Sequence, residues 1–244
     1  MKILALEASA VAASVALCED EVLLAESYQN TGLTHSQTLL PMAQELLARC
    51  GLGVADVDLI AVSAGPGSFT GLRIGVATAK GLAWAAEKPC AGCSTLESMA
   101  WGAAAHTGEL CVAMDARRGQ VYNACFRIED GRPVRLTPDR AIALDELIEE
   151  LRARGAGEQY VVGDGAALCC EALRQAGLPA RLAPEGARMQ RAYGVARLGL
   201  ELARTGGTVG PNELVPVYHR LSQAERERLA AEKKRSAIIT EGRT

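Results

Sequence analysis

The chain contains a glycine-rich segment that reads Gly65-Pro66-Gly67-Ser68-Phe69-Thr70-Gly71-Leu72-Arg73-Ile74-Gly75. An apolar, β-branched run (57–64) precedes it, and an apolar segment with helical spacing (72–87) follows it. Such a bend between a strand and a helix presents backbone N–H groups and the positive end of the helix, which suits an anion or a closely approaching backbone. Its glycine spacing is one residue too long for a dinucleotide fingerprint, and it lacks the Gly-Lys of a Walker A loop. The segment therefore predicts a strand–bend–helix unit of an α/β protein.

The composition is that of an ordinary globular protein. Hydrophobic residues make up 49% of the chain and charged residues 23%, both close to the usual proportions. A chain of 244 residues buries about 70–75% of its unfolded surface, enough for one large domain or two lobes. The net charge of −3 argues against a strong nucleic-acid-binding surface on this chain alone, because phosphate contacts need clustered Lys and Arg.

No membrane or targeting segment is expected. No apolar run reaches the roughly 20 residues of a membrane span, and the N-terminal residues show no signal-peptide cleavage pattern. We therefore expect a first strand at the N-terminus and a cytoplasmic protein.

The eight cysteines are expected to be buried thiols. Most of them lie inside apolar strands or helices, as is typical of small hydrophobic residues in a reducing compartment. Cys90 and Cys93 form a CxxC spacing within a predicted strand. A zinc site built from two such units would need a second CxxC, so this pair is weak evidence for metal or redox chemistry.

The first half of the chain has the predicted order β-β-β-α-β-α-β-α. Three short apolar runs joined by tight connections (2–8, 12–18 and 22–29) predict an antiparallel meander. Residues 35–50 carry apolar side chains at helical spacing and are followed by Gly51, which predicts a helix. We then expect strand 57–64, helix 72–87, strand 89–93 and helix 96–105.

The second half begins in the same way. We expect strands at 109–115, 120–128 and 134–136, helix 144–154, strand 160–162, helix 166–176, strand 178–183 and helix 191–205. The repeated β-β-β-α start predicts two similar lobes around a cleft, with boundaries 1–107 and 108–216 and with the tail 217–244 on the first lobe. Residues 223–235 are dense in charge, which is more typical of a solvated terminal helix than of a dedicated tRNA patch.

Two carboxylates lie at equivalent places in the predicted repeats. Glu7 ends the first strand of the first half, and Asp115 ends the first strand of the second half. Carboxylates at a cleft suit a magnesium–nucleotide site, since Mg²⁺ takes few protein oxygens beside those of phosphates. The structural alternative is that both residues hold turn backbones. The candidate anion or nucleotide cleft comprises Glu7, Ser9, Asp115, Arg117, Gly163, Asp164 and Gly165.

No metal site is expected. The three histidines, His35, His106 and His219, are widely separated and form no His-x-x-x-His pair. The sequence therefore argues against a histidine-bound metal site. No Gly-x-Ser-x-Gly elbow is present, which argues against a serine hydrolase of that fold.

Two helices of the first lobe carry more apolar and small residues than one sheet face needs. Small side chains at i, i+4 spacing let another backbone approach closely. They could pack on the sheet or on a second subunit, and we expect a partner interface there. Its candidate residues are His35, Leu39, Met42, Ala43, Leu46, Gly71, Gly75 and Ala79.

The chain resembles the TsaB (YeaZ) family. The resemblance lies in the segment Gly65 to Gly75, in His35-Ser36 with Leu39-Leu40-Pro41 before it, and in Ser94-Thr95-Leu96-Glu97 after it. It continues through Asp115-Ala116-Arg117-Arg118, Gly163-Asp164-Gly165 and Pro216-Val217-Tyr218-His219-Arg220. The likeness covers almost the whole chain.

The resemblance implies an α/β, actin-like (ASKHA, ribonuclease H-like) fold of two duplicated lobes. It implies a non-catalytic subunit that dimerises with and activates TsaD, which transfers a threonylcarbamoyl group to the tRNA adenosine beside the anticodon. A small ATPase, TsaE, would join the complex, tRNA would bind through the complex, and ATP or ADP would bind only there. A homodimer in isolation is the other assembly found in the family. The usual Asp-Thr-Ser after the first strand is Glu7-Ala8-Ser9 here, so the carboxylate is longer and one hydroxyl of the family motif is absent.

The alternative function is a free-standing enzyme, either an actin-like ATPase or kinase or a peptidase-like protein. No separate substrate domain is visible for a kinase, and the ligands of a metallopeptidase are missing. The glycines of the segment Gly65 to Gly75 fit neither phosphate-binding spacing, and small residues continue from them along the helix. We therefore expect these glycines to serve tight packing of the bend and helix on the partner-facing side. Anion binding by the amides of Ser68 to Thr70 is the secondary interpretation.

Overall fold

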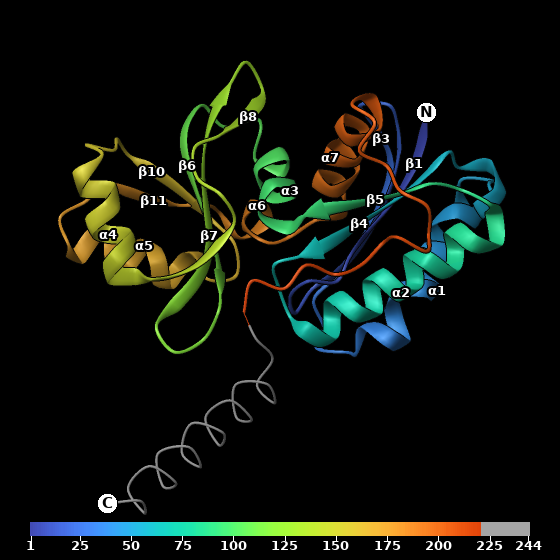
Figure 1. Cartoon of the computed structure of the whole chain (residues 1–244), viewed down its shortest axis with the longest axis horizontal. Coiled ribbons are helices and arrows are strands. Elements are labelled where there is room, and N and C mark those ends of the chain that lie inside the picture. The colour runs from blue at the N-terminus through green and yellow to red at the C-terminus, as the bar shows by residue number, and fades with distance from the viewer. Residues whose placement is uncertain (221–244) are drawn as a thin grey trace, which may run out of the picture.

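Each half of the chain folds around its own mixed β-sheet (Figure 1). The computed structural model describes residues 1–220, and the predicted terminal helix 223–235 lies outside these residues. Within the described residues no helix is long and apolar enough to cross a membrane.

The first sheet has the strand order β3-β2-β1-β4-β5. β1 (Lys2–Glu7), β2 (Ala13–Glu19) and β3 (Val22–Gln29) form the predicted antiparallel meander. β4 (Leu59–Gly65) and β5 (Cys90–Ser94) lie parallel to β1 on its other side. The central strands are apolar on both faces because helices cover both sides of the sheet.

The second sheet repeats this order as β8-β7-β6-β10-β11. β6 (Gly108–Asp115), β7 (Gln120–Glu129) and β8 (Arg132–Arg135) form the antiparallel part. β10 (Gln159–Val162) and β11 (Ala180–Leu182) are parallel to β6. An additional short strand that the sequence did not predict, β9 (Arg140–Ala143), pairs with β7. The duplicated actin-like fold is thereby confirmed.

The helices arrange these sheets into layers. α1 (His35–Arg49) and α2 (Phe69–Ala86) cover the outer face of the first sheet. α4 (Leu144–Ala153) and α5 (Ala166–Gln175) cover the outer face of the second. α3 (Thr95–Gly102) lies between the two sheets, as Figure 1 shows. Two short helical segments are η1 (Val54–Asp56) and α6 (Glu185–Arg188).

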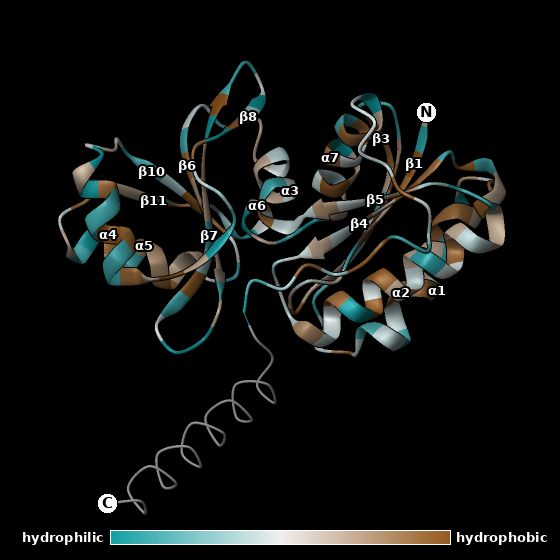
Figure 2. Ribbon diagram, viewed as in Figure 1, coloured by the Kyte–Doolittle hydropathy of each residue, from teal (hydrophilic) through white to brown (hydrophobic). Residues whose placement is uncertain are grey.

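The last long helix does not belong to the second lobe. We predicted it within 108–216, but α7 (Ala192–Arg204) packs on the inner face of the first sheet. Its buried side chains, such as Val195 and Leu198, meet Ile3, Leu59 and Ala91. The first sheet has two apolar faces, and α1 and α2 cover only one of them. Burial of the second face therefore stabilises the packing of α7 on the first sheet. In Figure 2, α7 carries apolar residues on one side and polar residues on the other.

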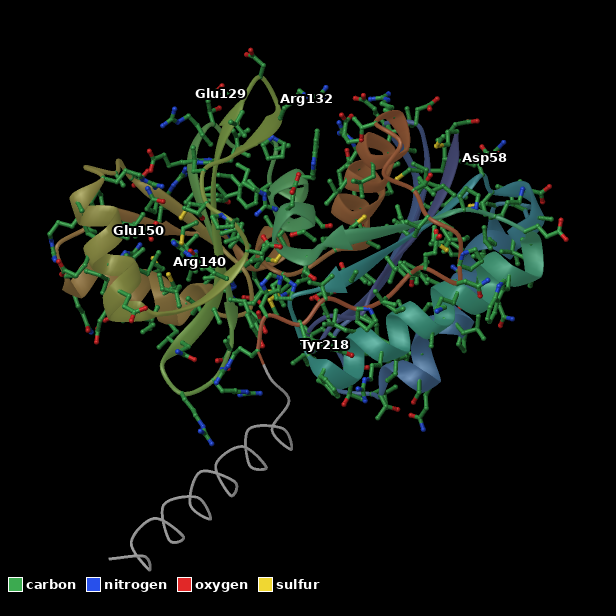
Figure 3. The ribbon with its side chains drawn as sticks, viewed as in Figure 1. Asp58, Glu129, Arg132, Arg140, Glu150 and Tyr218 are labelled. Carbon is green, nitrogen blue, oxygen red and sulfur yellow. The ribbon has the colours of Figure 1, made fainter. Side chains whose placement is uncertain are left out.

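Ion pairs hold the lobes together on the side opposite the C-terminal segment. Arg135 of β8 contacts Glu97 of α3 at 2.6 Å, and Arg132 of the same strand contacts Glu201 of α7 at 2.5 Å. Arg132, labelled in Figure 3, lies near the tip of the β7–β8 hairpin. The Arg135 guanidinium is part-buried, where an ion pair is screened less than on the surface. These contacts add to the apolar packing of α3 against the second sheet.

Candidate functional site

A cleft of about 500 Å³ lies between the lobes, where the central strands β1 and β6 end. Residues of both lobes and of the C-terminal segment line it. The carboxyl ends of the central strands are where ligands bind in open α/β sheets. The lining side chains are Ser9, Ala10, Val11, Gly67, Ser68, Phe69, Leu72, Met114, Asp115, Ala116, Arg117, Arg118, Tyr122, Asp164, Val217, Tyr218, His219 and Arg220.

Glu7 does not face this cleft, and its predicted place in a nucleotide site is wrong. Its side chain is 1% exposed. One carboxylate oxygen accepts from the Ser9 amide at 2.6 Å, and the other accepts from the Ser63 hydroxyl. Burial raises the pKa of Glu7, and the bonds from Ser63 and Ser9 oppose this only in part. Glu7 therefore holds the β1–β2 connection to β4, as the structural alternative proposed.

The raised pKa of Glu7 predicts a pH-dependent stability. Between the ordinary glutamate pKa and the raised one, the folded chain holds a proton that the unfolded chain releases. Lowering the pH through this window therefore stabilises the wild type by up to about 1.4 kcal/mol per pH unit, and a Glu7→Gln variant lacks this gain. Urea unfolding measures the free energy of unfolding of both proteins between pH 8 and pH 5. We expect the value of the wild type to rise relative to that of the variant as the pH falls. If the two free energies of unfolding differed by the same amount at every pH, the raised pKa of Glu7 would be contradicted.

Asp115 does line the cleft. It ends β6 and is partly exposed, with Arg117 as its neighbour in the turn. The Arg117 amide donates to Asp115 Oδ1 at 2.7 Å, and its guanidinium lies 3.2 Å from Oδ2. Arg117, Arg118 and Gly119 all have positive φ (66°, 57° and 69°), a conformation that L-residues other than Asn, Asp and Gly seldom adopt. The turn thereby holds Arg117 and Arg118 at the cleft.

The Gly163-Asp164-Gly165 turn brings a second carboxylate to the same place. A Cβ on Gly163, which has φ +114°, would collide with the Ala113 carbonyl, and one on Gly165 would lie 2.8 Å from the Asp115 amide nitrogen. The two glycines thus let the turn pack directly on β6. Asp164 Oδ1 accepts from Gln190 at 3.0 Å, and burial raises the pKa of Asp164.

The glycine-rich bend packs against the chain itself. A Cβ on Gly65 would collide with the Val217 carbonyl, one on Gly67 with the Ser9 backbone and one on Gly71 with the Ala8 carbonyl. The Ser68 amide donates to Ser9 O at 2.7 Å, so this amide is not free for an anion. The Ser68 hydroxyl accepts from the Gly71 amide at 3.3 Å and caps α2. This cap starts the helix at Phe69, three residues before the predicted start.

The C-terminal segment, whose residues 217–244 we expected on the first lobe, forms one wall of the cleft. The Val217 amide donates to Ala64 O at 2.7 Å, and the Tyr218 ring lies 4.6 Å from that of Phe69. The Arg73 guanidinium lies 3.8 Å from the centre of the Phe69 ring and donates to the Tyr218 hydroxyl at 3.0 Å. Arg220 reaches across and donates to the Ala116 carbonyl. The signal in the sequence was the apolar run at 214–218 after a glycine-rich break.

Comparison with known proteins identifies the family. A family model described as "TsaD: tRNA N6-adenosine threonylcarbamoyltransferase" matches residues 29–165, more than half of the chain. The "tRNA threonylcarbamoyladenosine biosynthesis protein TsaB" of Escherichia coli is 34% identical over 223 residues, covering 90% of this chain and 95% of that protein. The chain belongs to the TsaB family. The Bacillus subtilis TsaB is 34% identical over 154 residues, 63% of this chain and 67% of that protein. The solved structure of YeaZ from Pseudomonas aeruginosa superimposes with a TM-score of 0.76 at 28% identity, covering 89% of this chain and 99% of that chain.

The side chains predicted for the partner interface of this TsaB-family chain lie mostly in its own core. Leu39, Met42, Ala43, Leu46 and Ala79 are at most 8% exposed and pack between the helices and the first sheet. Gly71 and Gly75 are also buried, against Ala8 and Val62. The small residues at i, i+4 spacing therefore pack on the sheet, which was the alternative to packing on a second subunit. The exposed residues of α1 and α2 lie on the opposite faces of these helices.

Two further predictions concern histidine and cysteine. His35, which we expected at the partner interface, is half-buried, and its Nε2 lies 2.7 Å from Ala10 O in the β1–β2 connection. All eight thiols of the TsaB-family chain are free, and the CxxC pair lies in β5. Burial raises the pKa of Cys90 to about 11. Within residues 1–220, no three His, Cys, Asp or Glu side chains converge in a way that could hold a metal ion.

Proposed function

We propose that this protein is a non-catalytic subunit of tRNA threonylcarbamoyladenosine biosynthesis, which associates with a TsaD-type subunit and activates threonylcarbamoyl transfer to tRNA. The family membership over nearly the full length supports the pathway. A TsaE-type ATPase would join the complex, tRNA would bind the assembly, and ATP or ADP would bind only there. The free thiols suit the reducing cytoplasm as its place of action.

The observation that carries the non-catalytic role is the sealed carboxylate of the first lobe. A free-standing ATPase or kinase of this architecture would use acidic groups from both sides of the cleft to hold Mg²⁺ and activate a nucleophile. Here Glu7 is buried and bonded to Ser9 and Ser63. The two cleft carboxylates, Asp115 and Asp164, both come from the second lobe, and Arg117 and Gln190 already engage them.

The outward face of α2 is the surface that we propose for the TsaD-type subunit. Its exposed stripe, here called the α2 outer stripe, consists of Arg73, Ala77, Gly81 and Trp84. The small residues at its centre let a partner helix approach closely, and Trp84 is 57% exposed, an anchor type common at interfaces. Leu40 on the neighbouring helix α1 is also apolar and is 40% exposed. A homodimer would use the same faces when the partner is absent.

Association is the first test of this role. The purified full chain and a TsaD-type subunit are mixed with and without ATP and run on a size-exclusion column. We expect a 1:1 complex to elute ahead of either component. Separate elution under both conditions would rule out a direct partnership, and the chain would then need another role in the pathway.

A further inference from the structure

The cleft concentrates positive charge on a chain that is acidic as a whole. The net charge of the chain is −3. Three guanidinium groups line the cleft (Arg117, Arg118 and Arg220, here called the cleft arginines), opposed by the carboxylates of Asp115 and Asp164. The three guanidinium groups and the two carboxylates together leave about one net positive charge, which favours an anion at this place.

The cleft arginines are only partly engaged by the protein. Arg117 pairs with Asp115 at 3.2 Å, and Arg220 donates to the Ala116 carbonyl, which carries no net charge. Arg118 forms no ion pair within the described residues 1–220 and is exposed in the turn after β6. A guanidinium offers five N–H donors in a fork that matches the oxygens of a phosphate.

Aromatic rings stand beside these cations. Phe69, Tyr122 and Tyr218 line the same cleft, and the rings of Phe69 and Tyr218 lie 4.6 Å apart. Tyr218, labelled in Figure 3, sits where the C-terminal segment meets the end of α2 and is 41% exposed. A base stacks on such rings with about 1–3 kcal/mol per base, whereas Lys and Arg hold the backbone. The combination of rings and cations therefore suits a nucleotide unit.

The charge of the cleft separates an RNA phosphodiester from a free nucleoside polyphosphate. One net positive charge balances the single negative charge of a phosphodiester, but a triphosphate would bring several negative charges against Asp115 and Asp164. The rim is open at the turn after β6, where the Arg117 side chain is 84% exposed. We propose that the cleft binds one nucleotide of a single-stranded RNA segment, with its phosphate at the cleft arginines and its base against Phe69 and Tyr218. The choice of RNA rests on the proposed function.

Fluorescence anisotropy with a labelled anticodon stem-loop RNA tests this proposal on the full chain alone. We expect Arg118→Glu to weaken binding at least tenfold and to reduce the slope of log K against log salt by about one phosphate contact. Tyr218→Leu should weaken binding about fivefold because it removes a stacking ring. Arg49→Glu is the matched control. It makes the same charge change on α1, where the Arg49 side chain is 77% exposed, and binding should stay within twofold.

Three results would overturn the proposal. The first is no RNA binding at about 100 μM chain, the weak end of non-specific affinity, and the second is equal weakening by Arg118→Glu and Arg49→Glu. The third is displacement of the RNA by magnesium–ATP at concentrations below those of competing unlabelled RNA, which would assign the cleft to a free nucleotide. The TsaD-type subunit is absent from this assay. If the chain did not bind RNA but still associated with the TsaD-type subunit, the RNA site would be wrong and the proposed function would be unaffected. If the chain bound RNA but did not associate with that subunit, the proposed function would be wrong and the RNA site would be unaffected.

Discussion

Gly71→Ala is expected to lower the free energy of unfolding by about 2–4 kcal/mol. The added Cβ would collide with the carbonyl oxygen of Ala8, and that carbonyl belongs to the backbone of the β1–β2 connection. Overpacking of a well-packed site costs about 1–3 kcal/mol, and more where the neighbour is backbone that cannot rotate away. Relief would need a shift of α2 or of the segment that holds Glu7 and Ser9. Urea unfolding followed by circular dichroism measures the loss.

Gly81→Ala is the matched control on the same helix. Gly81 is exposed, and an added Cβ there meets no atom within 4 Å. Alanine is the better helix former by about 0.8–1 kcal/mol, so this variant should be slightly more stable than the wild type. If both variants behaved alike, the close approach of Gly71 to Ala8 would not be a determinant of the fold.

Ala77→Arg is expected to reduce association with the TsaD-type subunit and the activation that depends on it by at least 100-fold. Ala77 is exposed at the centre of the α2 outer stripe, so a long charged side chain there would hold a partner helix away. Truncation or blockage at the centre of an interface commonly costs 2–4 kcal/mol or more, and 100-fold corresponds to about 2.7 kcal/mol. Isothermal titration calorimetry measures the affinity, and unfolding curves show whether the variant is folded.

Ala153→Arg provides the comparison for that experiment. Ala153 is an exposed alanine at the end of α4 on the second lobe, so the same substitution should leave the affinity within twofold. Unchanged association of Ala77→Arg would remove the α2 outer stripe from the interface. A replacement of Ala79 would not serve, because Ala79 is fully buried and its enlargement would disturb the core.

The sequence predicted most of the fold because its hydrophobic pattern and its turns agreed. The repeated β-β-β-α order gave two lobes with the same strand order, and the central carboxylates Glu7 and Asp115 lie at equivalent strand ends. The pattern could not show which sheet would bury α7, because its apolar stripe fits either lobe. Only the uncovered inner face of the first sheet decides that contact.

The candidate site was predicted in part. The turn residues Asp115, Arg117 and Asp164 do meet at one cleft. Glu7 was misplaced because a carboxylate at a strand end looks the same in sequence whether it points into the cleft or toward Ser63 of the neighbouring strand. Leu39 and Ala79 were misplaced because an apolar helix face does not reveal whether a sheet or a partner covers it. Arg220 was missed because nothing local in the sequence places the C-terminal segment beside β6.

The most direct test of the account is threonylcarbamoyl transfer to tRNA in a reconstituted mixture. The assay supplies tRNA and radiolabelled threonylcarbamoyl adenylate to this chain alone, to a TsaD-type subunit with a TsaE-type ATPase, and to all three proteins together. The readout is the label in the tRNA. We expect transfer only in the complete mixture. Transfer by this chain alone, or an equal rate without it, would contradict the role of an activating, non-catalytic subunit.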